Sequence, residues 1–302
     1  MKILRTPDEC FADLPDWPWQ PRYTTIDAGD GTPLRMACVD EGPRDADPIV
    51  LMHGNPSWSY LYRHMIPGLL AAGHRVVAVD LVGLGRSDKP AAKSDYTLER
   101  HVQWMRAWYE AMELEHVTLF CQDWGGTIGL HMVADMPWRF DRVIAANTGI
   151  PLGEGGSKFL EMWVSMMREA TEFPWAMFPQ GMMRDLSEKE LAAYLAPFPA
   201  PEYQAGITEF PVLIAVQPDN PGVARNRAAW EKLATFDRPF LTLWGMLDAV
   251  ARGVDKRMHA HIPGCAGQPH QQYPNANHFL QEDVPAELVE ATLRFVASTP
   301  RA

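Results

Sequence analysis

Short apolar runs alternate with helical stretches along most of this chain, and this alternation restricts the possible folds most strongly. Runs of strand length lie at residues 23–28, 34–39, 49–52, 75–79, 117–121, 143–146, 240–244 and 270–273. Helical periodicity follows many of them, at 98–112, 126–136, 254–261 and 286–296. Buried strands that alternate with helices favour a mostly parallel eight-stranded sheet with helices on both faces.

The alternation is interrupted between residues 151 and 226. Strand-like runs disappear there, and prolines repeatedly break the helical stretches. We therefore expect a main domain made of residues 1–150 and 227–302, with a helical cap inserted at 151–226. Methionine is abundant in this insertion, which suits a lid that packs adaptably over an apolar cavity but equally suits ordinary gap filling between small helices.

Charge and cysteine content exclude several classes of partner. The 302 residues include 27 Lys and Arg against 38 Asp and Glu, so a nucleic-acid backbone or an anionic membrane would on average be repelled. No apolar run is long enough to span a membrane. The four cysteines are scattered without a Cys-x-x-Cys pair, which indicates reduced thiols. We expect a cytoplasmic monomer without metal or cofactor.

The segment 117–130 has the pattern of a strand, a sharp turn and a helix. At the turn, Cys121-Gln-Asp-Trp-Gly125 has small residues two positions either side of Asp123. This is the spacing of a nucleophile elbow, with an aspartate in the position that serine often occupies. A helix start at this point would keep the carboxylate ionised. The alternative is an aspartate that only caps the helix.

Three other loops follow predicted strands and carry polar residues. Asp248 follows the strand at 240–244, and His278 follows the strand at 270–273. The order nucleophile, acid, histidine is that of an α/β-hydrolase triad, in which the carboxyl ends of the strands form the site. The loop His53-Gly-Asn-Pro56 follows the strand at 49–52. We expect the backbone amides of Asn55 and Trp124 to form an oxyanion hole.

These strings resemble the haloalkane dehalogenases of the α/β-hydrolase superfamily. The resemblance rests on His53-Gly-Asn-Pro-Ser-Trp-Ser-Tyr-Leu-Tyr-Arg63, on Asp80-Leu-Val-Gly-Leu-Gly-Arg-Ser-Asp-Lys-Pro90 and on Gln122-Asp-Trp-Gly-Gly126. It continues through Tyr194-Leu-Ala-Pro-Phe-Pro199 in the cap to His278-Phe-Leu-Gln-Glu-Asp283, so it covers most of the chain. The nucleophile string alone is shared with epoxide hydrolases, and the combination is more specific.

The resemblance implies hydrolysis of a small apolar haloalkane to an alcohol and a halide ion. Asp123 would displace the halide and form an alkyl ester on the enzyme. His278 would then activate water, and Asp248 would orient the imidazole. No cofactor is needed, because a halide leaves a saturated carbon as a stable anion.

The resemblance also implies that two indole N–H groups hold the departing halide. Trp124 matches the first by position, and we expect Trp163 to be the second, with Trp175 as its rival. An indole donates a hydrogen bond and accepts none, which suits an anion in an apolar pocket. Simple packing is the alternative role for either tryptophan of the cap.

At position 55, this chain differs from the subfamily that it otherwise resembles more closely. That subfamily has its triad aspartate after the late strand, as at Asp248, but usually has glutamate where this chain has Asn55. In the other subfamily, an asparagine there helps to hold the halide and the triad acid is an earlier glutamate. We therefore expect the Asn55 side chain as a third halide donor. Glu154, the corresponding acid, is expected to be a surface charge.

Two alternatives remain open from the sequence. An epoxide hydrolase has the same Asp-His-Asp chemistry but usually protonates the epoxide oxygen with two tyrosines of its lid, and Tyr194 and Tyr203 lie in the cap. A ligand-binding relative without catalytic activity is the second alternative. The complete triad and oxyanion loop argue against it.

Overall fold

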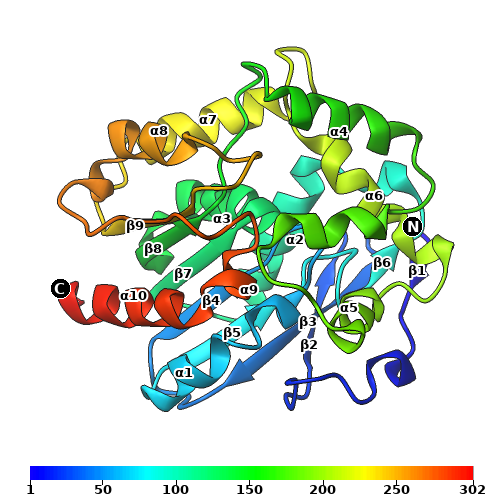
Figure 1. The fold of residues 1–302 in the computed structure, drawn as a ribbon, viewed down its shortest axis with the longest axis horizontal. Coiled ribbons are helices and arrows are strands. Elements are labelled where there is room, and N and C mark those ends of the chain that lie inside the picture. The colour runs from blue at the N-terminus through cyan, green and yellow to red at the C-terminus, as the bar shows by residue number, and fades with distance from the viewer. Residues whose placement is uncertain (302) are drawn as a thin grey trace.

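The computed structural model describes residues 1–301, which form a single central sheet with helices around it (Figure 1). The sheet has eight strands in the order β10-β9-β8-β7-β4-β5-β3-β2. The strands β5, β4, β7, β8, β9 and β10 pair in parallel, whereas β3 pairs antiparallel with both β5 and β2. The predicted mostly parallel sheet of eight strands is therefore confirmed.

The strands lie close to the ranges that the sequence predicts. Their bounds are Arg22–Asp27 for β2, Pro33–Glu41 for β3, Pro48–Met52 for β4, Arg75–Val79 for β5, Val117–Gln122 for β7, Phe140–Ala146 for β8, Phe240–Gly245 for β9 and Gln271–Tyr273 for β10. The strands β4, β7 and β9 are buried along their whole length, because helices cover both faces of the sheet. Outside this sheet, β1 (Ile3–Leu4) pairs with β6 (Lys89–Pro90).

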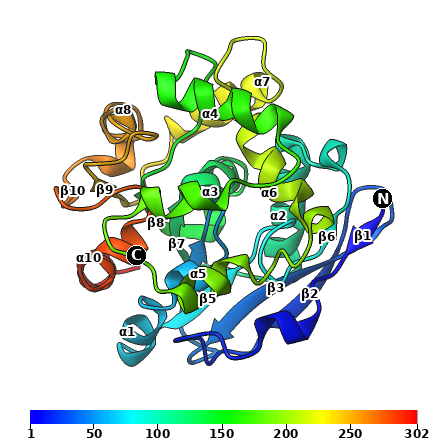
Figure 2. The ribbon, with the colours of Figure 1, turned by 45° about the vertical axis from the view of Figure 1, so that its right-hand side comes forward.

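Helices pack on both faces of the sheet (Figure 2). On one face, α2 (Leu98–Ala111) contacts α3 (Asp123–Asp135), which in turn contacts α7 (Val223–Leu233). On the other face, α1 (Ile66–Ala71) contacts α10 (Pro285–Ser298). Two further helices, α8 (Val254–His261) and α9 (Leu280–Asp283), lie just before β10 and just after it. None of the helices in residues 1–301 is both long and apolar enough to cross a membrane.

The segment between β8 and β9 is helical throughout its regular structure. It contains α4 (Lys158–Glu169), α5 (Glu188–Leu195), α6 (Ala205–Glu209) and α7, with 3₁₀ helices at Trp175–Gly181, Pro201–Gln204 and Phe210–Leu213 between them. Polar residues cap two of these helices, because Ser157 accepts from the amide of Leu160 and Ser187 forms a capping box with Glu190. The domain boundary at residue 226 stays a prediction, and it falls inside α7, which packs on α3.

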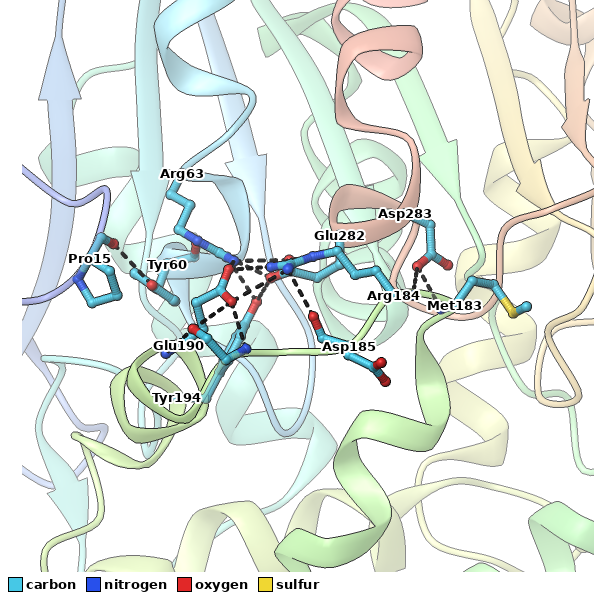
Figure 3. A network of polar contacts seen from close by, with 11 residues as sticks. Pro15, Tyr60, Arg63, Met183, Arg184, Asp185, Glu190, Tyr194, Glu282 and Asp283 are labelled. Atoms are coloured by element: carbon cyan, nitrogen blue, oxygen red, sulfur yellow. Dashed lines mark hydrogen bonds and ion pairs between the residues drawn. The ribbon is translucent and has the colours of Figure 1, made fainter.

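A buried cluster of charged residues joins the predicted cap to the main domain (Figure 3). Arg63 lies at the end of the 3₁₀ helix Ser59–Tyr62, and its guanidinium binds both oxygens of Glu282 in α9. From the cap, Arg184 also binds Glu282, at 2.6 Å, and Glu190 accepts from Arg63 at 2.9 Å. Removing one member of such a buried cluster would leave an uncompensated charge, which is strongly destabilising.

Candidate active site

Asp123 lies at the turn between β7 and α3, as the elbow pattern predicts. Its backbone has a φ of 49°, in the left-handed region that asparagine and aspartate tolerate better than most residues. Close backbone packing explains the glycine two positions later, because a Cβ at Gly125 would lie 2.2 Å from the carbonyl oxygen of Met52 in β4. The turn therefore presents the Asp123 carboxylate at the carboxyl edge of the sheet.

The loop after β4 contacts this carboxylate directly. The backbone amide of Asn55 donates to Oδ1 of Asp123 at 2.7 Å. A Cβ on Gly54 would lie 2.2 Å from that same oxygen, so only glycine permits this approach. The amide of Trp124 lies in the first turn of α3, where helical N–H groups have no acceptor within the helix. Of the two predicted oxyanion-hole amides, that of Asn55 contacts the Asp123 carboxylate, and that of Trp124 belongs to the next residue in the chain.

His278 and Asp248 complete a chain of polar contacts to Asp123. The imidazole Nδ1 of His278 lies 3.0 Å from Oδ2 of Asp248, and Nε2 lies 3.5 Å from Oδ2 of Asp123. His278 follows β10 and Asp248 follows β9, so both reach Asp123 from neighbouring loops at one edge of the sheet. Because Asp248 accepts from Nδ1, the Nε2 atom is the one that faces Asp123.

Burial and neighbouring charges shift the pKa values of His278 and Asp248. Burial opposes a charge on His278, but the carboxylates of Asp248 and Asp123 outweigh this effect and raise the pKa of His278 to about 10. Asp248 is also buried, yet His278 and the backbone amides of Val250 and Ala251 hold its pKa below the ordinary value. Asp248 is therefore an ionised carboxylate beside a basic imidazole.

Asn147, at the end of β8, holds the surrounding loops together. Its Oδ1 accepts from the amide of Gly245 at 2.8 Å, and its Nδ2 donates to the carbonyl of Asn277 at 3.0 Å. It therefore joins the end of β9 to the residue before His278. The sequence marks Asn147 only as the end of a strand, because its partners lie about a hundred residues away.

Gln122 is a second residue of the site that the sequence did not identify. Its side chain is buried beside His278, and its Nε2 lies 3.2 Å from the imidazole Nε2 and 3.1 Å from the His278 carbonyl oxygen. The amide therefore contacts both the ring and the backbone of His278. Its position directly before Asp123 is the one signal in the sequence that could have suggested this role.

A cavity of about 250 Å³ opens on Asp123, Asp248 and His278 beneath the predicted cap. Its lining includes Asn55, Asp123, Trp124 and His278 from the main domain and Trp163 from α4. The indole N–H groups of Trp124 and Trp163 donate no hydrogen bond within residues 1–301, nor does that of the buried Trp108, whereas that of Trp58 donates to the carbonyl of Ala193. Oδ1 of Asn55 is buried and likewise has no partner in this part of the chain.

Trp175 and the two tyrosines of the cap lie elsewhere. Trp175 packs among Phe173, Phe178 and Phe198 and is absent from the lining of the 250 Å³ cavity. The Tyr194 hydroxyl is buried against Glu282, in the charged cluster of Figure 3. Tyr203 does not line this cavity either. Neither tyrosine is therefore placed to donate to a substrate oxygen beside Asp123.

Comparisons with known proteins identify the fold and the family. A family model described as the alpha/beta hydrolase fold matches residues 47–285. A haloalkane dehalogenase of Psychrobacter cryohalolentis is 48% identical and aligns over 100% of both chains. One from Mycobacterium marinum is 45% identical over 96% of this chain and 98% of its own length.

Solved structures lead to the same assignment. The tetrameric haloalkane dehalogenase from Paraglaciecola agarilytica superposes with a TM-score of 0.90 and 37% identity, and the alignment covers 100% of each chain. Two findings therefore agree. The sequence identity extends over the full length of the chain, and the structure has an aspartate at the elbow with a histidine and a second aspartate at neighbouring strand ends. This chain is therefore an enzyme that belongs to the haloalkane dehalogenase family of α/β-hydrolases.

Proposed function

We propose that this enzyme hydrolyses haloalkanes through a covalent alkyl ester on Asp123. The observation that carries this mechanism is the contact chain from Asp248 through His278 to Asp123, at 3.0 and 3.5 Å. The Asp123 carboxylate borders a cavity with a mostly apolar lining, where a haloalkane can bind without losing hydrogen bonds to water. The net reaction consumes one water and yields an alcohol, a halide ion and a proton.

In the first step, a carboxylate oxygen of Asp123 attacks the carbon that carries the halogen. The carbon–halogen bond breaks, and its electron pair leaves with the halide. His278 transfers no proton in this step. The Asn55 amide holds Oδ1 of Asp123, so the attacking group is fixed in orientation before the substrate arrives.

In the second step, His278 removes a proton from water, which attacks the ester carbonyl. Esterification removes the negative charge of Asp123, one of the two charges that raise the pKa of His278. The pKa of His278 therefore falls in the intermediate, the ring releases its proton to solvent, and the neutral imidazole can then accept a proton from the attacking water. Asp248 stabilises the resulting imidazolium, while the amides of Asn55 and Trp124 hold the oxyanion.

The halide site in this proposal consists of the indole N–H groups of Trp124 and Trp163 and the side-chain amide of Asn55. All three residues line the 250 Å³ cavity beside Asp123. Replacement Trp163→Phe keeps an aromatic ring but removes one donor to an anion, a loss of about 1.5–3 kcal/mol. We expect bromide to inhibit this variant about tenfold or more weakly, as measured from its inhibition constant in steady-state turnover.

Trp175→Phe is the matched control for the halide site, because it makes the same change in the same segment. Trp175 packs among phenylalanines and does not line the cavity. Its bromide inhibition constant should stay within twofold of the wild-type value. The assignment would be reversed if Trp175→Phe weakened inhibition and Trp163→Phe did not.

Halide release from a substrate panel tests the proposed reaction itself. Purified protein given 1-bromobutane or 1,2-dibromoethane should release bromide and acidify the medium in equal amounts, because each turnover yields one halide and one proton. Styrene oxide serves as the comparison substrate for epoxide hydrolysis. Turnover of styrene oxide together with no halide from chlorinated, brominated or iodinated alkanes would contradict the proposal.

The oligomeric state and the cellular location are separate from the chemistry. The similar Paraglaciecola enzyme is a tetramer. The monomeric state and the cytoplasmic location expected for this chain stay predictions.

A further inference from the structure

A second and larger cavity, of about 600 Å³, also borders Asp123 and His278. The two cavities are contiguous, because they share eight lining residues: Asp123, Trp124, Phe159, Leu160, Ile214, Ala249, Val250 and His278. From there it extends between the start of the predicted cap and the helices α7 and α8. We call this larger cavity the distal chamber. The proposed displacement at Asp123 needs only the smaller cavity for the halide, so the distal chamber requires a different explanation.

The inner part of the distal chamber is mainly apolar. Its walls include Ile150 and Leu152 after β8, Trp230 in α7, and Ala251 and Val254 after β9. Ile150, Leu152 and Ala251 are buried beneath the surrounding chain. Such walls suit a hydrocarbon chain, since each methylene that leaves water improves binding about fourfold.

The outer end of the distal chamber is charged. Glu154, Arg252 and Arg257 line it and are exposed, so they lie where the chamber meets solvent. Arg257 pairs with Glu154 at 2.9 Å, an exposed ion pair of the kind that contributes little and opens readily. Arg252 forms no ion pair with any other residue in 1–301. The rim therefore offers one guanidinium without a carboxylate partner.

We propose that the distal chamber binds the remote end of an elongated haloalkane whose far terminus is polar or anionic. The carbon–halogen bond would lie at Asp123, the hydrocarbon chain would run along the apolar walls, and the terminal group would meet Arg252 at the rim. This inference rests on the proposed function and names its substrate class. With a short haloalkane bound, water would fill the distal chamber, and its apolar walls would contribute no binding free energy.

Three substrates that differ in length and in their far end test the inference on the intact enzyme. They are 1-bromobutane, 1-bromooctane and 8-bromooctanoate, and the readout is kcat/KM from bromide release. We expect both eight-carbon substrates to exceed 1-bromobutane by tenfold or more. Replacement Arg252→Gln should lower kcat/KM for 8-bromooctanoate about threefold to tenfold relative to kcat/KM for 1-bromooctane. High salt should reduce this effect of the replacement, because it screens the charge of Arg252.

Narrowing the distal chamber gives the decisive measurement. Two independent replacements, Ala251→Leu and Val254→Phe, add volume to different walls of the chamber, so one misfolded variant would not leave the inference undecided. In each, the ratio of kcat/KM for 1-bromooctane to that for 1-bromobutane should fall tenfold or more. The matched control Ala228→Leu lies on the exposed side of α7, outside both cavities, and should keep the wild-type ratio.

The outcomes separate this inference from the proposed function. If all three bromides are hydrolysed but both narrowing variants keep the wild-type length ratio, the distal chamber does not hold substrate and the inference fails alone. If none of the three substrates releases bromide, the proposed function fails, and the inference falls with it. A length ratio that falls in the narrowing variants and not in Ala228→Leu supports it.

Discussion

Asp123→Asn should abolish halide release, with turnover reduced by a factor on the order of 10⁴ or more. The replacement keeps the size of the side chain, and asparagine tolerates the left-handed backbone that this turn requires, at a φ of 49°. It removes the charged oxygen that attacks carbon, and a neutral amide is a poor nucleophile. The expected result is therefore a folded protein that binds substrate but releases no halide from it.

The measurement is bromide release from 1-bromobutane, together with the intact mass of the protein before and after the assay. The mass is needed because hydrolysis of the new amide would restore a carboxylate and, with it, activity. Asp237→Asn is the matched control, since Asp237 is exposed and lies outside both cavities. Turnover by Asp123→Asn at a rate near that of the wild type, with the amide intact, would exclude Asp123 as the nucleophile.

His278→Ala should stop the reaction after one turnover. The first step needs no proton transfer, so each active site should release one halide ion. The second step loses its general base, which contributes about 10²- to 10⁴-fold, and the ester should then accumulate. We expect a burst of bromide equal to the enzyme concentration, followed by a rate reduced by this factor.

Mass spectrometry distinguishes this arrest from simple inactivation. After reaction with 1-bromobutane, the peptide that contains Asp123 should gain the mass of one butyl group in place of a proton. His74→Ala serves as the control, because His74 is partly exposed and precedes β5, at the edge of the sheet opposite the carboxyl ends of the strands. The absence of both burst and adduct would show that His278 is needed before the carbon–halogen bond breaks, contrary to the proposed order of steps.

Much of the fold could be predicted from local pattern alone. Strands such as β4 and β7 are continuous apolar runs because both faces of the sheet are covered, and this leaves a clear signal in the sequence. The short helix α1 was not predicted, since six residues that include a proline and a glycine carry little periodicity. The predicted boundary of the cap at residue 226 lies within α7 and stays a prediction.

The contacts around the catalytic residues required the tertiary structure. Gln122 reaches His278 across 156 positions of sequence, and Arg63 reaches Glu282 across 219. Local composition contains no information about such pairs, because they depend on how the loops and the cap pack on the sheet. The same holds for the two tryptophans of the cap, of which Trp163 lines the cavity and Trp175 packs among phenylalanines.

The sequence by itself determined the sheet, the elbow at Asp123 and the placement of Asp248 and His278 after later strands. It could do so because a parallel sheet brings the carboxyl ends of its strands to one edge, whatever lies between them in the chain. The tertiary structure alone decided which cap side chains face the catalytic residues and that a second cavity with a charged rim begins there. Cavities arise where non-local side chains fail to fill space, and no local pattern in a sequence encodes that.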